Sequence, residues 1–241
     1  MSGHSKWANI KRRKESVDSK RANVFSKLGK EIAVAVKVGG SGDISINSKL
    51  RDIVAKAKSQ NMPNDNINRC IQKAAGDSNS ANYEEITYEG FGPCGVAVIV
   101  ESMTDNKNRA AADIRCIFNK SGGTMGQSGC VSYMFEKKGY ILIEKSKNID
   151  EDYLMMEVLD KGAEDFVSED EYIEITSTPD KFSILREFIE KKGYLILEAD
   201  IRQIANMKKE LDTQQEEKLQ NFLDKLDEND DVQNVWHDAN M

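Results

Sequence analysis

The segment GYILIEKSKNIDEDYLMMEVLDKGAEDFVSEDEYIEITSTPDKFSILREFIEKKGYLILE, residues 139–198, decides the fold of this chain. Short β-branched and aromatic runs such as YILIE (140–144) and YLILE (194–198) are typical of strands. Between them, apolar residues recur at helical spacing over 150–161 and again after Thr178-Pro179-Asp180, where proline suits the first turn of a helix. The order is strand, helix, strand, strand, helix, strand, which predicts a ferredoxin-like module.

The segments on either side predict a second α/β module. VAVIV (96–100) and VSYMF (131–135) are typical of strands, and Asp105 is expected to cap a helix between them. Towards the end, TQQE (213–216) matches a capping box, and VQNVW (232–236) is the expected final strand. These flanking elements complete a second ferredoxin-like module if the first is inserted into it.

The first 80 residues predict a small helical bundle. Apolar residues follow helical spacing in three stretches, which GGSGD (39–43) and NMPND (61–65) separate. Asn47 and Asn64 are the expected N-caps of the second and third helices. The fold class is therefore α+β and multi-domain, with an N-terminal helical bundle followed by two ferredoxin-like α/β domains, one inserted into the other. The expected domains are 1–80, 81–136 plus 200–241, and 137–199.

Composition favours a soluble globular protein. Of 241 residues, 39% are hydrophobic and 31% are charged, and no apolar run approaches the roughly 18 residues that span a bilayer. The start of the chain lacks the apolar region of a secretory signal, so we expect a cytoplasmic location and no membrane partner. The four cysteines are widely spaced without a CxxC pair, which predicts reduced, mostly buried thiols and no metal site.

Charge is distributed unevenly along the chain. Residues 1–80 hold 16 Lys or Arg against 7 Asp or Glu, whereas residues 81–241 hold 18 against 34. This asymmetry favours contact between the basic part and a nucleic acid. The alternative is that the basic and acidic parts neutralise each other.

No arrangement of residues predicts catalysis. GFGPCG (90–95) matches the GxGxxG motif of dinucleotide-binding proteins in sequence. A strand rather than a helix is expected to follow it, so we interpret it as a tight turn. The two histidines, His4 and His237, lie at opposite ends of the chain and offer no base for a nucleophile. DENDD (227–231) lacks the glycine and spacing of a calcium loop, and we expect a solvated acidic turn. The protein is predicted to be no enzyme, with no cofactor and no small-molecule substrate.

SGGTMGQSG (121–129) lacks the lysine of a phosphate-binding P-loop. Gly122 and Gly123 fit a helix C-cap, and the glycines that follow indicate a flexible, exposed loop. Such a loop could lie on an RNA or on a protein partner. Gly122, Gly123 and Gly126 are therefore a secondary candidate for contact.

The main candidate for nucleic-acid binding is a basic arm near the start of the chain. Cations dense enough to neutralise phosphates surround an aromatic residue that could stack on a base. The arm consists of Lys6, Trp7, Lys11, Arg12, Arg13, Lys14, Lys20, Arg21, Lys27 and Lys30. The alternative is a solvated tail with Trp7 packed into the bundle.

Five blocks of sequence resemble the YebC/PmpR family, which includes the mitochondrial translational activator of cytochrome c oxidase. They are GHSKWANIK (3–11), NMPNDNI (61–67), NYEEITYEGFGP (82–93), DNKNR (105–109) and DVQNVWHDA (231–239). The resemblance implies three domains and no enzymatic activity. It also implies either a DNA-binding transcriptional regulator or a ribosome-associated factor that relieves stalling, with DNA, ribosomal RNA or tRNA as partner. A third hypothesis is a protein-interaction scaffold whose basic arm docks on its own acidic domains.

Overall fold

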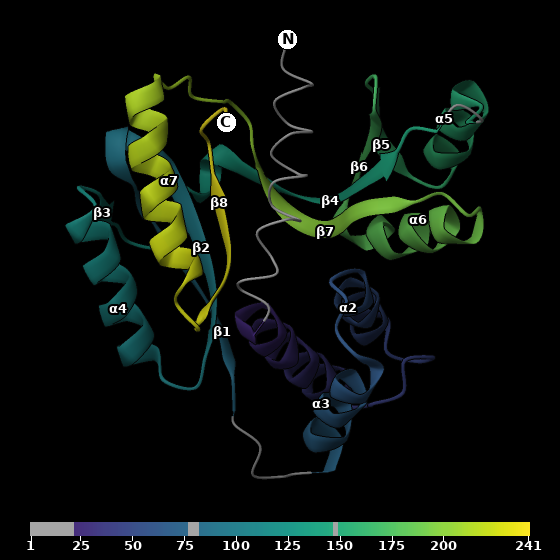
Figure 1. The fold of residues 1–241 in the computed structure, drawn as a ribbon, viewed down its shortest axis with the longest axis horizontal. Coiled ribbons are helices and arrows are strands. Elements are labelled where there is room, and N and C mark those ends of the chain that lie inside the picture. Colours follow the sequence, from purple (N-terminus) through teal and green to yellow (C-terminus); the bar gives the residue numbers. More distant parts are fainter. Residues whose placement is uncertain (1–21, 77–81, 147–148) are drawn as a thin grey trace. The chain divides into compact units, whose positions relative to one another are not determined.

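The computed structural model describes residues 22–76, 82–146 and 149–241 (Figure 1). Among these residues, Glu136–Ile204 form one compact unit, and residues 22–135 together with Ala205–Met241 form another. The finer division into three domains, at the boundaries expected from the sequence, stays a prediction.

The N-terminal region of the second unit is helical. It contains a helix over 22–39, α2 (Ser48–Ser59) and α3 (Asn64–Gly76). Asn47 caps α2 by accepting a hydrogen bond from the Leu50 backbone N–H, as expected from the sequence. The expected cap of α3, Asn64, is instead the first residue of that helix. The three helices bury one shared core, in which Ile32, Leu50 and Ala57 have no exposed surface.

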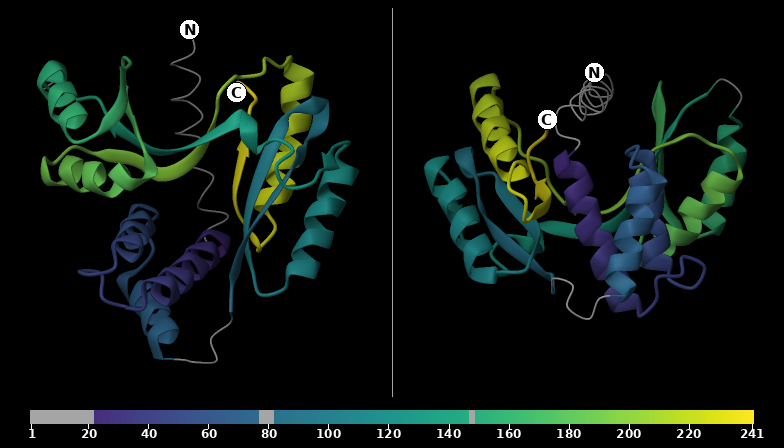
Figure 2. Two further views of the ribbon diagram at one scale, coloured as in Figure 1. Left: turned by 180° about the vertical axis from the view of Figure 1, so that it is seen from behind. Right: turned by 60° about the horizontal axis from the view of Figure 1, so that its bottom comes forward.

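The same unit contains a four-stranded antiparallel sheet in the order β3-β1-β2-β8. Its strands are β1 (Glu84–Phe91), β2 (Ala97–Thr104), β3 (Thr124–Met125) and β8 (Val232–His237). Helices α4 (Lys107–Lys120) and α7 (Thr213–Asp227) pack on one face of it (Figures 1 and 2). The Phe118 and Phe222 rings meet edge to face there, with centroids 4.9 Å apart. This packing buries one face of the sheet.

The strand order of this sheet places β2 and β3 parallel with β1 between them, because both strands pair antiparallel to β1. The spatial arrangement is that of a ferredoxin-like sheet, but the strand between β2 and β3 comes from before β2 in the chain. The short 3-10 helices η1 (Pro93–Gly95) and η2 (Ser132–Met134) lie in the loops of this sheet.

The unit formed by Glu136–Ile204 is built on a second antiparallel sheet, in the order β5-β6-β4-β7. Its strands are β4 (Phe135–Glu144), β5 (Ala163–Ser168), β6 (Tyr172–Ser177) and β7 (Ile196–Ala205). With α5 (Glu151–Asp160) after β4 and α6 (Pro179–Lys191) after β6, the chain follows the strand-helix-strand-strand-helix-strand order that the sequence predicts. Ile141, Leu154 and Leu185 join strands and helices in one buried core.

Several local expectations differ from the structure. The segment 131–135 was expected to be a strand, but η2 occupies most of it and β4 begins only at Phe135. The N-cap of α4 is Asn106 rather than Asp105, and the capping box of α7 joins Asp212 to Gln215 rather than starting at Thr213. In each helix the cap is shifted by one residue, to a neighbour that also has a side-chain acceptor.

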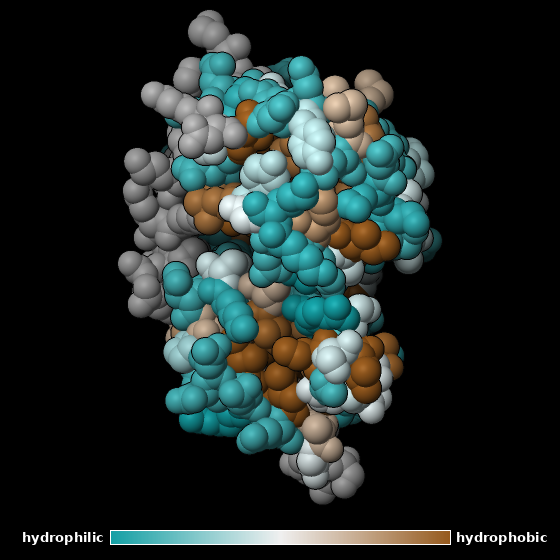
Figure 3. All heavy atoms as spheres, turned by 90° about the vertical axis from the view of Figure 1, so that its right-hand side faces the viewer, coloured by the Kyte–Doolittle hydropathy of each residue, from teal (hydrophilic) through white to brown (hydrophobic). Residues whose placement is uncertain are grey.

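The fold class is confirmed: the structure is α+β, with an N-terminal helical region and two four-stranded antiparallel sheets. On the face drawn in Figure 3, hydrophilic side chains predominate and hydrophobic side chains gather in patches among them. Of the described residues, Val38, Ile46, Tyr133 and Met207 are among the most exposed large hydrophobic side chains.

Candidate nucleic-acid interface

The structure describes two residues of the predicted basic arm, Lys27 and Lys30. The other eight lie outside the described residues: Lys6, Trp7, Lys11, Arg12, Arg13, Lys14, Lys20 and Arg21. Lys27 and Lys30 stand on the helix over 22–39, and both reach the segment between α7 and β8.

Lys27 is buried, with 8% of its surface exposed. Its ammonium group donates to the Asp227 side chain at 2.7 Å and to the Asp227 backbone carbonyl at 2.8 Å. Asn23 donates to the same carbonyl at 3.2 Å. A buried cation with these partners is satisfied within the chain, so Lys27 fixes the helix to the end of α7.

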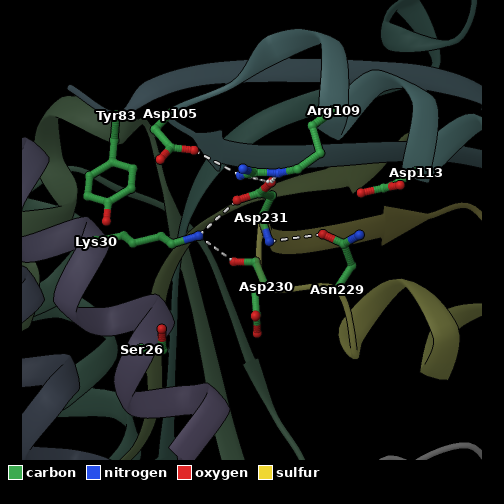
Figure 4. A pocket seen from close by; sticks show the side chains of 9 residues that line it. All are labelled: Ser26, Lys30, Tyr83, Asp105, Arg109, Asp113, Asn229, Asp230 and Asp231. Atoms are coloured by element: carbon green, nitrogen blue, oxygen red, sulfur yellow. Dashed lines mark hydrogen bonds and ion pairs between the residues drawn. The ribbon is translucent and has the colours of Figure 1, made fainter. Parts of the chain in front are cut away.

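Lys30 binds Asp230 and Asp231, a few residues further along the chain (Figure 4). Its ammonium group donates to the Asp231 carboxylate at 3.0 Å and to the Asp230 backbone carbonyl at 2.7 Å. The Tyr83 ring centroid lies 5.5 Å from the same nitrogen, within the range of a cation–π contact. The ammonium groups of both described arm residues are thus held by the chain itself.

Asp231 is the centre of this network, which we call the Asp231 cluster: Lys30, Thr104, Arg109 and Asp231. The Asp231 carboxylate also accepts from Arg109 Nη2 at 2.8 Å and from the Thr104 hydroxyl at 3.0 Å. Burial would raise the pKa of Asp231, but hydrogen bonds from Arg109 and Lys30, together with the Lys30 charge, outweigh it and hold the pKa below its ordinary value. The cluster joins the helical region, α4 and β8 through one ionised group.

The stretch DENDD (227–231) was expected to be a solvated acidic turn, and this is wrong for its last residue. Asp231 is only 5% exposed. The stretch is the docking point of the helical region rather than a free acidic loop. The sequence gives no local signal for this, because the partners of Asp231 lie 201 and 122 residues away.

A polar pocket of about 410 Å³ surrounds the cluster (Figure 4). It is lined by Ser26, Lys30, Tyr83, Asp105, Arg109, Asp113, Asn229, Asp230 and Asp231. Its four carboxylates outnumber its two cations, and Arg109 is additionally paired with Asp105 at 2.8 Å. A pocket with an excess of negative charge is unsuited to a phosphate, and we interpret it as a structural junction.

The helical region carries further cations that the sequence prediction did not include. Over residues 22–76 there are nine Lys or Arg against four Asp or Glu. Lys58, Arg69 and Lys73 are exposed on α2 and α3. They could have been predicted from the sequence, because they fall on the polar faces of amphipathic helices.

The glycine loop (121–129) lies at the other end of the sheet, beside the end of β1. Gly122 ends α4 with a φ of +78°, as expected of a helix C-cap. A side chain at Gly123 would come within 2.6 Å of the Phe91 carbonyl oxygen, and one at Gly126 within 2.5 Å of the Cys130 sulfur. Glycine is needed at position 123, where the neighbouring atoms are backbone, whereas a side chain at position 126 would require the Cys130 side chain to move.

Glu89 organises the segment that follows. Its carboxylate accepts backbone N–H groups from Gly129 at 2.8 Å, Val131 at 2.9 Å and Ser132 at 2.8 Å. Burial favours a raised pKa, but these three donors outweigh it and lower the pKa of Glu89. The loop is exposed, as predicted, and its C-terminal end is fixed by this one side chain. The sequence prediction missed Glu89, which lies among other glutamates on a strand.

The cysteines are free in the structure, and their expected burial is wrong: Cys116 is exposed, and Cys70, Cys94 and Cys130 are half-buried. Within residues 22–76, 82–146 and 149–241, no group of three or more His, Cys, Asp or Glu side chains could hold a metal ion. In the same ranges, no helix has both the length and the apolar character needed to cross a membrane.

Comparison with known proteins assigns the chain to a family. Residues 5–77 match the model of the TACO1/YebC protein N-terminal domain, and residues 83–239 match that of the TACO1/YebC second and third domain. A probable transcriptional regulatory protein of Acetivibrio thermocellus is 54% identical over 238 residues, which cover 98% of each chain. One of Clostridium acetobutylicum is 54% identical over 239 residues, which cover 99% of this chain and 97% of the relative.

A solved structure has the same fold. The crystal structure of a conserved hypothetical protein from Aquifex aeolicus matches with a TM-score of 0.81 and 39% sequence identity. The match covers 92% of this chain and 91% of that one. With both family models matched in order along nearly the whole sequence, the chain belongs to the TACO1/YebC family.

Proposed function

We propose that the chain is a non-enzymatic, nucleic-acid-binding regulator of gene expression of the YebC type, acting in the cytoplasm without a cofactor. The observation that carries this proposal is the positive charge of the helical region, nine cations against four carboxylates over 22–76, in a chain whose formal net charge is -7. Such a local excess favours a polyanionic partner. The names of the relatives, probable transcriptional regulatory proteins, agree with it.

The basic arm is the proposed contact. Lys6, Lys11, Arg12, Arg13, Lys14, Lys20 and Arg21 would neutralise phosphates, and Trp7 would stack on a base. Lys27 and Lys30 have their ammonium groups held by Asp227 and Asp231, so their larger role is to anchor the helix that follows the arm. Because each is paired with a carboxylate, they are not counted among the proposed phosphate contacts.

This surface has two candidate nucleic-acid targets. A regulator of transcription would bind duplex DNA, whereas a translation factor that relieves stalling would bind ribosomal RNA or tRNA on the ribosome. The arm is rich in phosphate-binding side chains and poor in the Asn and Gln that read base edges, which favours RNA or binding without sequence preference. Gly122, Gly123 and Gly126 form the proposed secondary contact.

The test is the salt dependence of binding. With six or seven phosphate contacts, the affinity of the full chain for duplex DNA should fall with salt at a log–log slope on the order of -5 to -6. The double variant Arg12→Ala/Arg13→Ala should reduce the steepness of that slope by about 1.8, since each lost phosphate contact contributes about 0.9. Fluorescence anisotropy of a labelled duplex at several salt concentrations measures both.

The matched control is Lys218→Ala/Lys225→Ala, which removes the same charge from exposed positions on α7. Its slope should equal that of the unmodified chain, and the thermal stability of both variants should be unchanged. Equal slopes for the arm variant and the control would show that the arm does not bind phosphates.

The scaffold hypothesis is the second candidate, and one observation favours it. Two basic residues of the predicted arm, Lys27 and Lys30, already bind carboxylates of the acidic part of the chain. If the remaining arm residues did the same, the chain would not bind nucleic acid. A binding isotherm that is flat with both DNA and RNA at low salt would support this scaffold.

A further inference from the structure

Three loops meet at the end of the sheet where β1 ends. We call them the loop surface: residues 91–96, 121–134 and 206–209. Phe91 pairs with Thr124 across β1 and β3. The Asn206 backbone N–H donates to the Met134 carbonyl at 2.9 Å, and Lys209 Nζ donates to the Cys94 carbonyl at 2.7 Å. These contacts hold segments from three distant parts of the sequence in one surface.

The loop surface is free of acidic residues. None of its three segments contains Asp or Glu, although residues 81–241 carry 34 of them against 18 Lys or Arg. Its cations are Lys208 and Lys209, and Lys120 in the last turn of α4 stands next to Ser121, the first residue of the second segment. The Glu89 carboxylate beneath the second segment is only 5% exposed, and the exposed Glu136 and Glu210 lie just outside the segments, so the segments themselves present only positive charge to an anion.

Exposed aromatic and sulfur-containing side chains accompany these cations. Tyr133 is 73% exposed, Met207 is 80% exposed and Phe91 is 41% exposed. The backbone beneath Tyr133 is fixed on both sides, because Glu89 binds the Ser132 N–H at 2.8 Å and Asn206 donates to the Tyr133 carbonyl at 3.5 Å. Because its backbone is already anchored, the exposed Tyr133 ring can stack on a base with little further loss of conformational entropy on binding.

We propose that the loop surface binds single-stranded nucleic acid, with Tyr133 stacked on a base and Lys120 and Lys208 in contact with phosphates. Base stacking on an aromatic platform flanked by cations is how single strands are bound without sequence preference. Protein interfaces share the exposed aromatic residues but are depleted in lysine, so the two lysines favour the nucleic acid. This inference rests on the proposed function, in that the chain binds nucleic acid, but not on the basic arm.

The test uses a labelled single-stranded oligouridine and the full chain, with affinity measured by fluorescence anisotropy. Tyr133→Ala should weaken binding by about 5- to 100-fold, the usual effect of removing one stacked ring. Tyr133→Phe keeps the ring and should bind within about twofold of the unmodified chain. Lys120→Ala/Lys208→Ala should reduce the steepness of the log–log salt slope by about 1.4, since each phosphate contact to a single strand contributes about 0.7.

Tyr153→Ala is the matched control, since Tyr153 is 50% exposed on α5, outside the loop surface. Its affinity should equal that of the unmodified chain. If Tyr133→Ala also binds normally while Arg12→Ala/Arg13→Ala weakens binding, the loop surface is refuted and the arm stands. If the unmodified chain binds neither oligouridine nor duplex DNA, the proposed function itself fails and this inference fails with it.

Discussion

The Asp231 cluster gives the sharpest prediction about stability. Replacing Asp231 with Asn keeps the shape of the side chain but removes the charge that Lys30 and Arg109 share, and it turns an N–H₂ group toward these donors. Hydrogen bonds to charged groups contribute about 1.5–3 kcal/mol each. The Lys30 side chain is only 13% exposed, so its hydrogen bond to Asp231 should contribute the whole of this free energy. The Arg109 side chain is 49% exposed, so its bond to Asp231 should contribute less than about 1 kcal/mol. Together these give a loss of about 2–4 kcal/mol.

The matched control is Asp230→Asn. Asp230 is exposed, and it contacts Lys30 through its backbone carbonyl, which the substitution leaves in place. Urea unfolding followed by circular dichroism should therefore show Asp230→Asn within about 0.5 kcal/mol of the unmodified chain. For units of this size, the loss in Asp231→Asn should lower the Tm by on the order of 5–10 °C. Equal stability of the two variants would refute the assignment of Asp231 as the residue that holds the helical region.

Three further predictions follow from the same contacts. The stabilisation by Asp231 should be present above pH 3.8, its ordinary pKa, and should be lost as the pH falls through the lowered folded value. In urea titrations, the difference in unfolding free energy between the unmodified chain and Asp231→Asn should therefore narrow only as the pH is lowered below about 3.8. Glu89→Gln should lower the free energy of unfolding by about 1–3 kcal/mol and speed hydrogen exchange at the amides of the glycine loop. Glu85→Gln, at an exposed position on the same strand, should change neither the stability nor the exchange. Gly90→Ala would place a methyl group 2.4 Å from the Thr124 carbonyl oxygen, so β3 should separate from β1 at a cost of about 1–3 kcal/mol, and normal thermal stability of this variant would contradict the packing.

Elements with a regular apolar stripe could be predicted from the sequence. Leu50, Ile53, Val54 and Ala57 form the expected stripe of α2, and all four are buried. The expected order of elements in the segment 139–198 is also confirmed. In both regions, the spacing of apolar residues along one segment determines the structure, because the burial of a helix or strand face depends on its own periodicity.

Elements fixed by distant partners could not be predicted in this way. β1 carries three glutamates and an uneven pattern of exposure, so it has no clear strand signal, and Glu89 is buried only because the N–H groups of residues 129–132 turn toward it. Two N–H groups of the segment 131–135 donate to Glu89, and the segment contains η2, although its composition is typical of a strand. Asp231 is the corresponding example for the candidate site, since its partners are more than a hundred residues away in sequence.

The most direct test of the central claim, that this chain acts on nucleic acid, is sedimentation of the full-length protein from a cell lysate through a sucrose gradient at low and moderate salt. Parallel samples are treated with RNase, with DNase or with neither. The account predicts rapid sedimentation in the untreated sample at low salt, less of it at moderate salt, and its loss after one of the two nucleases. RNase sensitivity would identify the ribosome or another RNA as the target, and DNase sensitivity would identify DNA. Protein that stays at the top of every gradient, whatever the salt or nuclease, would contradict the account.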